Sequence, residues 1–325
     1  PIPKKKNILG LYLFFSTFLK AYKGSLKNFK GWSKKRIKFV SHHDLHTYTA
    51  IGSSRFRRGV YLNIDGGGDL GDQRNFTWGI FKNNKIKEYQ SLKGLNSIAC
   101  FHAFITEFCG FRDQNGKTSG LSAYGSINYE LKKELEKVLI ISKKGIYFLR
   151  ERRNITEPTL KNINIDNYDR TKIFKDQISK TNIFEICKGY LPQDVAITAE
   201  KIISEQIVKF LRMIKNIYFK KFDHIIFSGG LFLNVKINSD IENSKIFKKC
   251  FFTMAPSDSG LSLGGIFSEN IKLKKDMFSK LGLTPFLGPS FSEFEINKLL
   301  KNYKLNYSIP KNLEKEIAQE IRKKK

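Results

Sequence analysis

Two short apolar segments that each run into glycines constrain the fold of this chain most. Residues 59–64 (GVYLNI) lead into 65–69 (DGGGD), and residues 224–227 (HIIF) lead into 228–230 (SGG). Apolar runs of this length, bounded by glycine, indicate buried strands, and glycines after a strand let backbone N–H groups approach a bound phosphate. Before the second strand, residues 195–217 place apolar side chains at spacings of three and four, which predicts one face of a long helix. Strands and helices in this order indicate an α/β protein with two related lobes.

The segments around the first strand predict further elements. A short strand at 36–40 leads into a group of histidines, and residues 76–82 and 86–89 flank an Asn-Asn pair that is typical of a hairpin turn. Residues 97–110 have a helical pattern, whereas residues 116–125 (GKTSGLSAYG) contain three glycines, which predicts a loop.

The composition favours a globular protein without a membrane segment. A chain of 325 residues, 41% of them hydrophobic, is long enough to bury a sizeable core. The apolar run at 8–19 is too short for a bilayer, which needs about 20 residues, so we expect a buried helix or strand there and a cytoplasmic protein. The four cysteines lie far apart without a C-x-x-C pair, which favours buried reduced thiols over a zinc cluster or a disulfide framework.

The net charge is strongly positive. Lysine and arginine total 58 against 30 acidic residues, a formal charge of +28, and such a balance attracts polyanions such as nucleic acid or an anionic membrane. The basic residues are nevertheless spread along the whole chain in short runs, which is typical of a solvated surface. We therefore expect no specific nucleic acid and no membrane as partner, although a phosphate-bearing substrate would benefit from the positive field.

Three of the five histidines lie within five residues of one another. His42 and His46 are four residues apart, which on a helix places both rings on one face. Two nitrogen ligands of one metal ion need this spacing, although a polar helix start would produce the same cluster. Asp44 would point elsewhere on the turn, as a cap or as a hydrogen-bond partner of a ligand.

Two aspartates stand where a cation could be held. Asp65 precedes Gly66 and Gly68 in a loop that could bind a cation beside a phosphate, but an acidic hairpin turn has the same composition. Asp258 lies at an expected helix start before several small residues, where an ordinary N-cap is the alternative. A further polar residue, Asn234, follows the second glycine pair and could hydrogen-bond a ribose or base, although a plain strand-to-helix turn would look similar.

Taken in order, these segments resemble the NodU/CmcH-type O-carbamoyltransferases, whose metal-binding domain is similar to that of the Kae1-like threonylcarbamoyl-transfer proteins. The string KRIKFVSHHDLH resembles the family's HHxxH segment, and IDGGGD resembles its DGxGE/D loop. The string SIACFHAFITEFCGFRDQNGKTSGLSAYG resembles its aromatic helix followed by GKxMGLAxYG. Likewise FSGGLFLNVKIN resembles GGxxxNxxxN, APSDSGLSLGGI resembles GDxGxAxGAA, and FLGPSFSEFEINKLL resembles the connector that follows, so that the resemblance covers roughly residues 36–300.

The resemblance implies an α/β fold, a two-lobed sugar-kinase/actin-like (Kae1-like) domain with a central mixed sheet in each lobe. It divides the chain into a first lobe with the metal and phosphate motifs at 1–126, a variable insertion at 127–193, a second lobe with the nucleotide motif at 194–284, and a connector at 285–325. The family's amino-terminal HDS strand has no match here, and its adenylate-forming domain follows the connector. We therefore expect a fragment truncated at both ends, which could be inactive alone or could use a carboxy-terminal domain supplied in trans.

The resemblance also implies a reaction, the transfer of a carbamoyl group from carbamoyl-adenylate, made from ATP and carbamoyl phosphate, to a hydroxyl of a small molecule such as a sugar or antibiotic. It implies a divalent metal, Fe(II) in the family, held by His42, His46, Asp65 and Asp258, of which the first three would be catalytic. The residues implied to contact the nucleotide or its phosphates are Gly66, Gly68, Lys117, Gly229, Gly230 and Asn234.

Two other functions remain open from the sequence. A tRNA threonylcarbamoyl-transfer subunit shares the paired histidines and would use the positive charge to bind RNA, but its glycine loop typically reads SGGH and it lacks the GKxxGLxxYG run. A non-catalytic remnant would keep metal and nucleotide affinity without turnover.

Overall fold

In the computed structural model the chain forms two compact units, residues 1–281 and residues 282–325. The structure describes residues 40–54, 56–68, 74–82, 85–93, 97–112, 114–148, 182–272 and 288–323.

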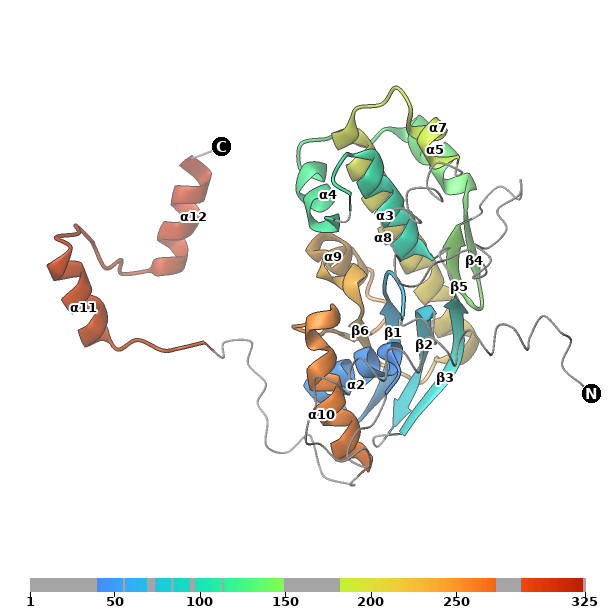
Figure 1. Cartoon of the computed structure of the whole chain (residues 1–325), viewed down its shortest axis with the longest axis horizontal. Helices are drawn as coiled ribbons and strands as arrows, with labels where there is room; N and C mark the ends of the chain where they lie inside the picture. The colour runs from blue at the N-terminus through green and yellow to red at the C-terminus, as the bar shows by residue number, and fades with distance from the viewer. Residues whose placement is uncertain are drawn as a thin grey trace, which may run out of the picture. The chain divides into compact units, whose positions relative to one another are not determined.

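A five-stranded mixed sheet forms the centre of the first unit (Figure 1). In the order β3-β2-β1-β6-β7, β1 pairs antiparallel with β2 and parallel with β6, β2 pairs antiparallel with β3, and β7 pairs parallel with β6. The strands are β1 (Arg58–Ile64), β2 (Arg74–Lys82), β3 (Lys85–Lys93), β6 (His224–Ser228) and β7 (Lys249–Phe252).

The strands predicted at 59–64, 76–82, 86–89 and 224–227 are therefore confirmed, and with them the α/β class. A central sheet for each of two lobes is not confirmed, because β1 of the expected first lobe pairs directly with β6 of the second. The predicted strand at 36–40 and the apolar run at 8–19 fall outside the described residues, except for Val40, which lies in neither a helix nor a strand.

The strand β1 is buried on both faces, and its side chains alternate between them. Val60, Leu62 and Ile64 belong to the main hydrophobic core, which also contains the apolar face of α8 (Pro192–Tyr218). The predicted helix at 195–217 is thus confirmed. Tyr61 points to the opposite face, where it packs in a smaller core with α2.

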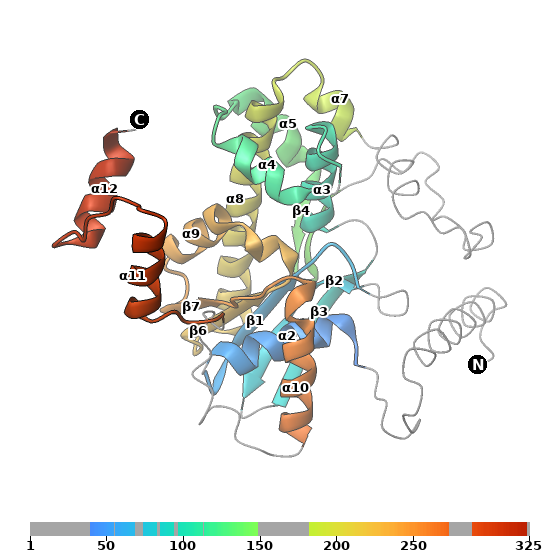
Figure 2. The same cartoon turned by 60° about the vertical axis from the view of Figure 1, so that its left-hand side comes forward.

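The helix α2 (His42–Ser54) packs on that opposite face of the sheet, and α10 (Leu261–Lys272) crosses α2 in close contact (Figure 2). Their close approach requires a glycine, because a Cβ atom on Gly264 would lie 2.2 Å from the carbonyl oxygen of Leu45. The small residues after Asp258 therefore let α10 pack tightly on the helix that carries both histidines.

A set of helices and a hairpin covers the other side, around α8. The set contains α3 (Ile98–Phe108), α4 (Asn115–Ser122), α5 (Tyr129–Lys137), α7 (Ile183–Cys187) and α9 (Val235–Asn243), with the hairpin of β4 (Leu139–Ser142) and β5 (Gly145–Phe148). The helix predicted at 97–110 is confirmed as α3, and the described part of the expected insertion at 127–193 holds α5, β4, β5 and α7.

The loop predicted at 116–125 is wrong over most of its length, because Asn115–Ser122 form the helix α4. Tertiary contacts override the low helix propensity of its glycines. Thr118 is buried and its hydroxyl donates to Thr106 Oγ1 of α3 at 2.8 Å, while Ser122 donates to Glu200 of α8 at 2.7 Å.

The second unit contains α11 (Glu293–Asn302) and α12 (Leu313–Lys323). A capping box begins α11, because the Ser292 hydroxyl accepts from the Glu295 N–H and the Glu295 carboxylate accepts from the Ser292 N–H. All four cysteines are free thiols, of which Cys100 and Cys187 are buried as expected, whereas Cys109 and Cys250 are only half-buried. None of the described helices is long and apolar enough to cross a membrane.

Candidate metal centre and cavity

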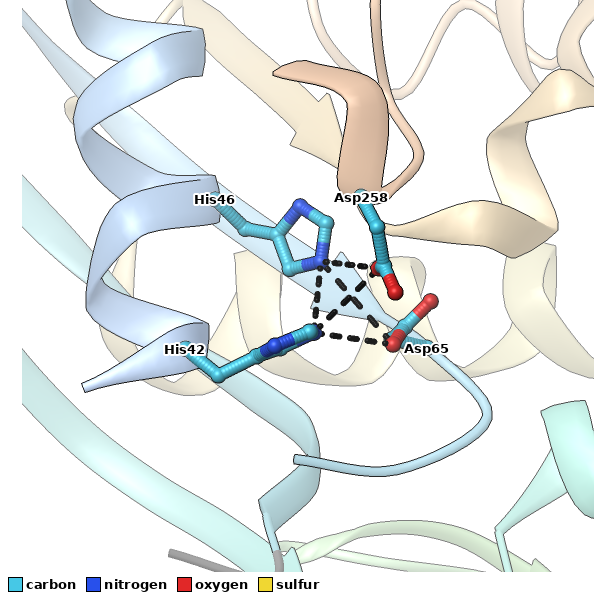
Figure 3. Close-up of side chains that lie close together, drawn as sticks. All are labelled: His42, His46, Asp65 and Asp258. Carbon is cyan, nitrogen blue, oxygen red and sulfur yellow. Dashed lines mark hydrogen bonds and ion pairs between the residues drawn. The ribbon is translucent and has the colours of Figure 1, made fainter. Parts of the chain in front are cut away.

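The first turns of α2 carry the two histidines toward one point (Figure 3). His42 and His46 are one helical turn apart, their ring centroids are separated by 4.8 Å, and their Nε2 atoms by 3.2 Å. Both rings are buried. The predicted helical i, i+4 pair is confirmed, and it presents two ring nitrogens side by side.

Asp65 comes to the same point because it follows β1. The alternation of the strand puts Asn63 and Asp65 on the face of Tyr61, which is the face that α2 covers. Asp65 Oδ2 lies 3.3 Å from His42 Nε2 and 3.9 Å from His46 Nε2. Burial favours the neutral acid, but the hydrogen bond with His42, the nearby His46 ring and the hydrogen bond from the Gly230 N–H outweigh it and hold the pKa of Asp65 well below its usual range.

Asp258 completes the group from the far end of the chain. It begins η5 (Asp258–Gly260), a short 3-10 helix that precedes α10, and Ser257 rather than Asp258 holds the N-cap position. Its Oδ1 lies 3.4 Å from His42 Nε2 and 3.7 Å from His46 Nε2. The predicted convergence of the four side chains is confirmed, since one ligand atom of each lies within 4.8 Å of all the others.

The geometry and chemistry of this group fit a divalent metal ion. Ligand atoms at about 2.1 Å from one ion lie about 3 Å apart when their bonds meet at right angles and about 4.2 Å apart when they are opposite. The measured separations between His and Asp atoms, 3.3 to 3.9 Å, fall in that range. Two imidazoles with two carboxylates suit a mid-row transition ion better than calcium, which prefers oxygen ligands alone.

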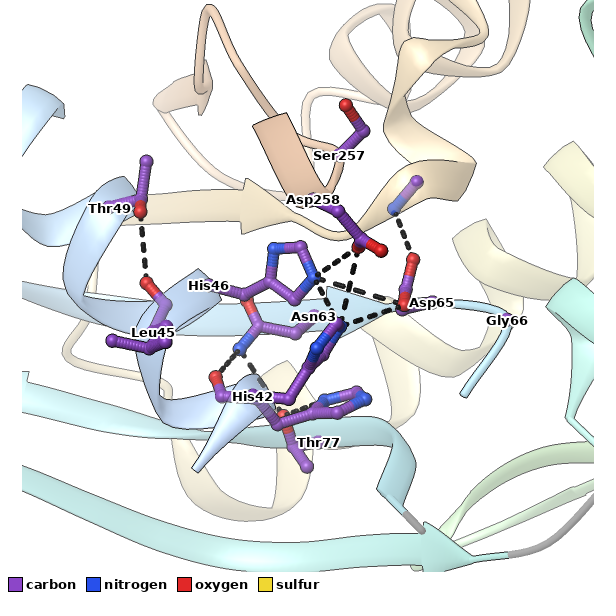
Figure 4. A network of polar contacts seen from close by, with 12 residues as sticks. His42, Leu45, His46, Thr49, Asn63, Asp65, Gly66, Thr77, Ser257 and Asp258 are labelled. Carbon is purple, nitrogen blue, oxygen red and sulfur yellow. Dashed lines mark hydrogen bonds and ion pairs between the residues drawn. The ribbon is translucent and has the colours of Figure 1, made fainter. Parts of the chain in front are cut away.

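A hydrogen-bond network fixes the ligand-bearing elements (Figure 4). Asn63 Nδ2 donates to the His43 carbonyl at 3.2 Å and to Thr47 Oγ1, which ties β1 to the first turn of α2. The Thr49 hydroxyl lies 2.8 Å from the Gly260 carbonyl oxygen and connects α2 to η5. Each of the three ligand-bearing segments is thus anchored to a neighbour rather than to solvent.

Asp44 does not join the four residues of the candidate metal group. Its Oδ1 accepts a hydrogen bond of 3.0 Å from Arg74 Nη2, and Arg74 also contacts Ser41 and pairs with Glu88 of β3 at 2.5 Å. This arrangement anchors the start of α2 to the sheet.

The metal group stands at the wall of a cavity of about 1100 Å³ that extends among α3, α4, α8 and α9. Asp65 and Asp258 line the cavity, together with three of the residues expected to contact a nucleotide, Gly66, Gly230 and Asn234. The volume exceeds that of a typical small-molecule pocket, about 300 to 1000 Å³. The cavity is therefore of a size suited to a small-molecule ligand.

The other expected nucleotide contacts are not part of this wall. Gly68 is half-buried, Lys117 is exposed on α4, and Gly229 is buried. Gly229 has φ 94° and ψ 152°, and its N–H donates to the Pro256 carbonyl at 2.8 Å. A contact of these residues with a nucleotide stays a prediction.

The glycine pair and Asn234 have a positioning role that is visible without a ligand. The Gly230 N–H donates to Asp65 Oδ1 at 2.8 Å, which leaves Oδ2 to face the histidines. Asn234 is the N-cap of α9 through its Oδ1, and its Nδ2 donates to Ser119 at 2.9 Å and to Glu200. The polar atoms of Asn234 are thus already engaged within the protein.

Sequence reasoning missed two polar residues on the cavity wall, His102 of α3 and Glu200 of α8. Both are buried, with 6% and 3% of their surface exposed. The only signal in the sequence is a charged residue on the apolar face of a long helix, since Glu200 lies between the buried positions Ala199 and Ile203. A buried carboxylate in that position needs a partner or a ligand.

Comparison with known proteins defines the class to which this fold and site belong. The model of the family described as "Carbamoyltransferase N-terminus" matches residues 4–266, so the chain belongs to this family. The match spans β1 and β6 and all four residues of the candidate metal group.

Two relatives illustrate the range of this family. The uncharacterized protein MJ1058 of Methanocaldococcus jannaschii is 26% identical over 92% of this chain and 49% of its own length. The nodulation protein NolNO of Sinorhizobium fredii is 22% identical over 70% of this chain and 30% of its own length. The chain spans half or less of the length of these relatives.

Two solved structures match this chain at low similarity. The crystal structure of HypF from T. kodakarensis has a TM-score of 0.40 and 13% identity, covering 74% of this chain and 38% of HypF. A full-length HypF in its phosphate- and nucleotide-bound form has a TM-score of 0.41 and 12% identity, covering 75% of this chain and 38% of HypF.

Proposed function

We propose that this chain is the Kae1-like transfer domain of a NodU/CmcH-type O-carbamoyltransferase. In this proposal the domain moves a carbamoyl group from carbamoyl-adenylate to a hydroxyl of a sugar or another small hydroxylated molecule. The observation that carries the proposal is the position of the candidate metal group, because Asp65 and Asp258 both lie on the wall of a cavity of about 1100 Å³.

His42, His46, Asp65 and Asp258 would hold a divalent ion, for which we propose Fe(II). Such an ion would supply Lewis-acid chemistry toward substrate oxygens. Three of these side chains are buried, whereas the Asp258 side chain is 71% exposed. Asp258 is therefore the ligand at the boundary between the group and the cavity.

The transfer step is a substitution at the carbamoyl carbon. The hydroxyl oxygen of the acceptor forms a bond to this carbon, the bond from the carbon to the adenylate phosphate oxygen breaks, AMP leaves and the hydroxyl proton is released to solvent. Orientation of the two reactants in one cavity contributes to the rate because it makes the reaction effectively unimolecular. In this proposal the exposed backbone of Gly66 lies beside the adenylate phosphate, next to the ligand Asp65.

The test supplies the intermediate directly, so that its formation from ATP and carbamoyl phosphate is not required. Purified chain is loaded with Fe(II) without oxygen and incubated with carbamoyl-adenylate and a panel of aminoglycosides and sugars, and carbamoylated products are detected by mass spectrometry. We expect a product that gains the mass of one carbamoyl group with release of AMP, and loss of that product in His46→Ala. The absence of acceptor-dependent AMP release from folded, metal-loaded protein would contradict the proposal.

A further inference from the structure

A second polar cluster lines the same cavity, separate from the metal group. It consists of Glu200 of α8, His102 of α3, Ser122 of α4 and Asn234, the cap of α9. These residues come from four different elements, and Glu200 is at the centre of their contacts. The contacts with Ser122 and Asn234 place the carboxylate of Glu200 firmly, so the cluster is a built feature of the wall.

Glu200 has unused capacity to accept hydrogen bonds. Its Oε2 accepts from the Ser122 hydroxyl at 2.7 Å and its Oε1 accepts from Asn234 Nδ2 at 2.5 Å. A carboxylate has about four acceptor positions, so about two remain. Within the described part of the chain, no lysine or arginine forms an ion pair with it, and the nearest basic atom is His102 Nε2, 4.0 Å from Oε1.

His102 adds a second unsatisfied group at this place. Burial, opposed by the nearby Glu200, lowers the pKa of His102, which favours the neutral ring. The ring is almost entirely buried, and its Nε2 has no hydrogen-bond partner among the described residues. Buried polar atoms of this kind are usually paired, either within the protein or with a ligand.

We propose that Glu200 and His102 bind a hydroxyl group of the substrate, and that they select a sugar at this end of the cavity. A hydroxyl can donate to the carboxylate and also pair with a neutral imidazole. A cationic group fits less well, because Lys201 and Lys236 line the same cavity. The inference rests on the proposed function for the identity of the substrate, and it extends that function by naming the residues that recognise the sugar.

Two sources of sugar hydroxyls share this chemistry, the ribose of an adenine nucleotide and a sugar acceptor. The first arm of the test measures the binding of ADP, 2′-deoxy-ADP and 3′-deoxy-ADP by calorimetry to the parent, Glu200→Gln and His102→Phe. The control is Glu205→Gln, the same change on the same helix, at a side chain that pairs with Lys132 at 2.8 Å. The second arm measures the saturation-transfer NMR signal of D-glucose, with D-glucosamine as the cationic comparison.

If the ribose occupies the site, ADP affinity falls about tenfold or more in Glu200→Gln and in His102→Phe, and removal of one ribose hydroxyl makes the parent equally weak. If the acceptor occupies it, ADP affinity stays constant but the D-glucose signal disappears in both variants and persists in Glu205→Gln. Either result supports the inference. Thermal unfolding confirms that each variant is folded.

The inference is overturned if folded Glu200→Gln and His102→Phe bind ADP and D-glucose as the parent does, if the parent binds neither probe, or if D-glucosamine binds more tightly than D-glucose through Glu200. Neither arm requires turnover. A chain that recognises sugar hydroxyls through Glu200 but transfers no carbamoyl group would therefore contradict the proposed function and leave this inference standing. A chain that transfers the carbamoyl group but binds both probes without Glu200 and His102 would support the proposed function and overturn this inference.

Discussion

Replacing Gly229 by alanine should damage both the fold and the metal group. Gly229 has φ 94° and ψ 152°, a conformation that costs a residue with a Cβ atom about 1–3 kcal/mol. The new Cβ would also lie 2.3 Å from the carbonyl oxygen of Ile64, a backbone atom of β1 that is held in the sheet. Overpacking of this kind adds about 1–3 kcal/mol. We therefore expect Gly229→Ala to lose about 3 kcal/mol or more of unfolding free energy.

The effect should extend to metal binding because contacts of Gly229 and Gly230 position two of the proposed ligands, Asp65 and Asp258. The Gly229 N–H donates to Pro256 in the segment that precedes Asp258, and the next N–H, that of Gly230, donates to Asp65. A displaced backbone breaks these contacts, so we expect at least a tenfold weaker affinity for Fe(II), which is about 1.4 kcal/mol.

Urea unfolding of the metal-free protein and a metal titration measure the two effects. Gly120→Ala is the matched control, since Gly120 lies in α4 with no atom near its Cβ position, and alanine there should add about 0.5–1 kcal/mol. The same glycine-to-alanine change is therefore expected to lower the unfolding free energy at position 229 and to raise it at position 120. Equal stability and equal metal affinity of Gly229→Ala and the parent would refute this reasoning.

Three further predictions follow from the site and the charge. The pKa of Asp65 is lower in the folded protein than its unfolded value near 3.9, so the ionised carboxylate stabilises the fold fully above that value, and this stabilisation is lost as the pH falls through the folded pKa. The difference in unfolding free energy between the metal-free parent and Asp65→Asn, measured by urea unfolding, should therefore shrink below about pH 4. Thr49→Val removes the hydroxyl that contacts Gly260 and should weaken metal binding by about 1 kcal/mol without changing the helix content measured by circular dichroism. An unchanged metal affinity would show that the contact between Thr49 and Gly260 does not position η5. Any nucleic-acid binding should weaken steeply with salt and be indifferent to sequence in a filter-binding assay, whereas tight binding of one tRNA at about 0.2 M salt would favour threonylcarbamoyl transfer.

The metal group could be predicted from the sequence because short-range periodicity decides where its parts point. Residues four positions apart on a helix lie on the same face, which brings His42 and His46 together. The period of two in β1 puts Asp65 on the face covered by that helix. Asp258 could be added only through the resemblance to a family, since nothing local indicates that η5 lies beside α2.

The elements and residues that sequence reasoning missed depend on contacts between distant segments. The helix α4 forms although Gly116 and Gly120 disfavour it, because its buried threonine and serine bond to other helices. Glu200 could not be recognised as part of a cavity from its position on α8 alone, since its partners are 78 and 34 residues away in the chain. Periodicity predicts which face is buried, but it does not predict which buried polar side chains meet.

The binding of one divalent ion by His42, His46, Asp65 and Asp258 is the central claim, and metal analysis after reconstitution tests it most directly. The chain is loaded with Fe(II) without oxygen, unbound ion is removed, and the bound iron is measured by elemental mass spectrometry. The variants His42→Ala and His46→Ala are treated in the same way. The control is His224→Ala, because His224 stacks on Phe56 outside the group. We expect one ion per chain in the parent and in His224→Ala, and far less than one in the other two. Full stoichiometric metal in folded His42→Ala and His46→Ala would contradict the account.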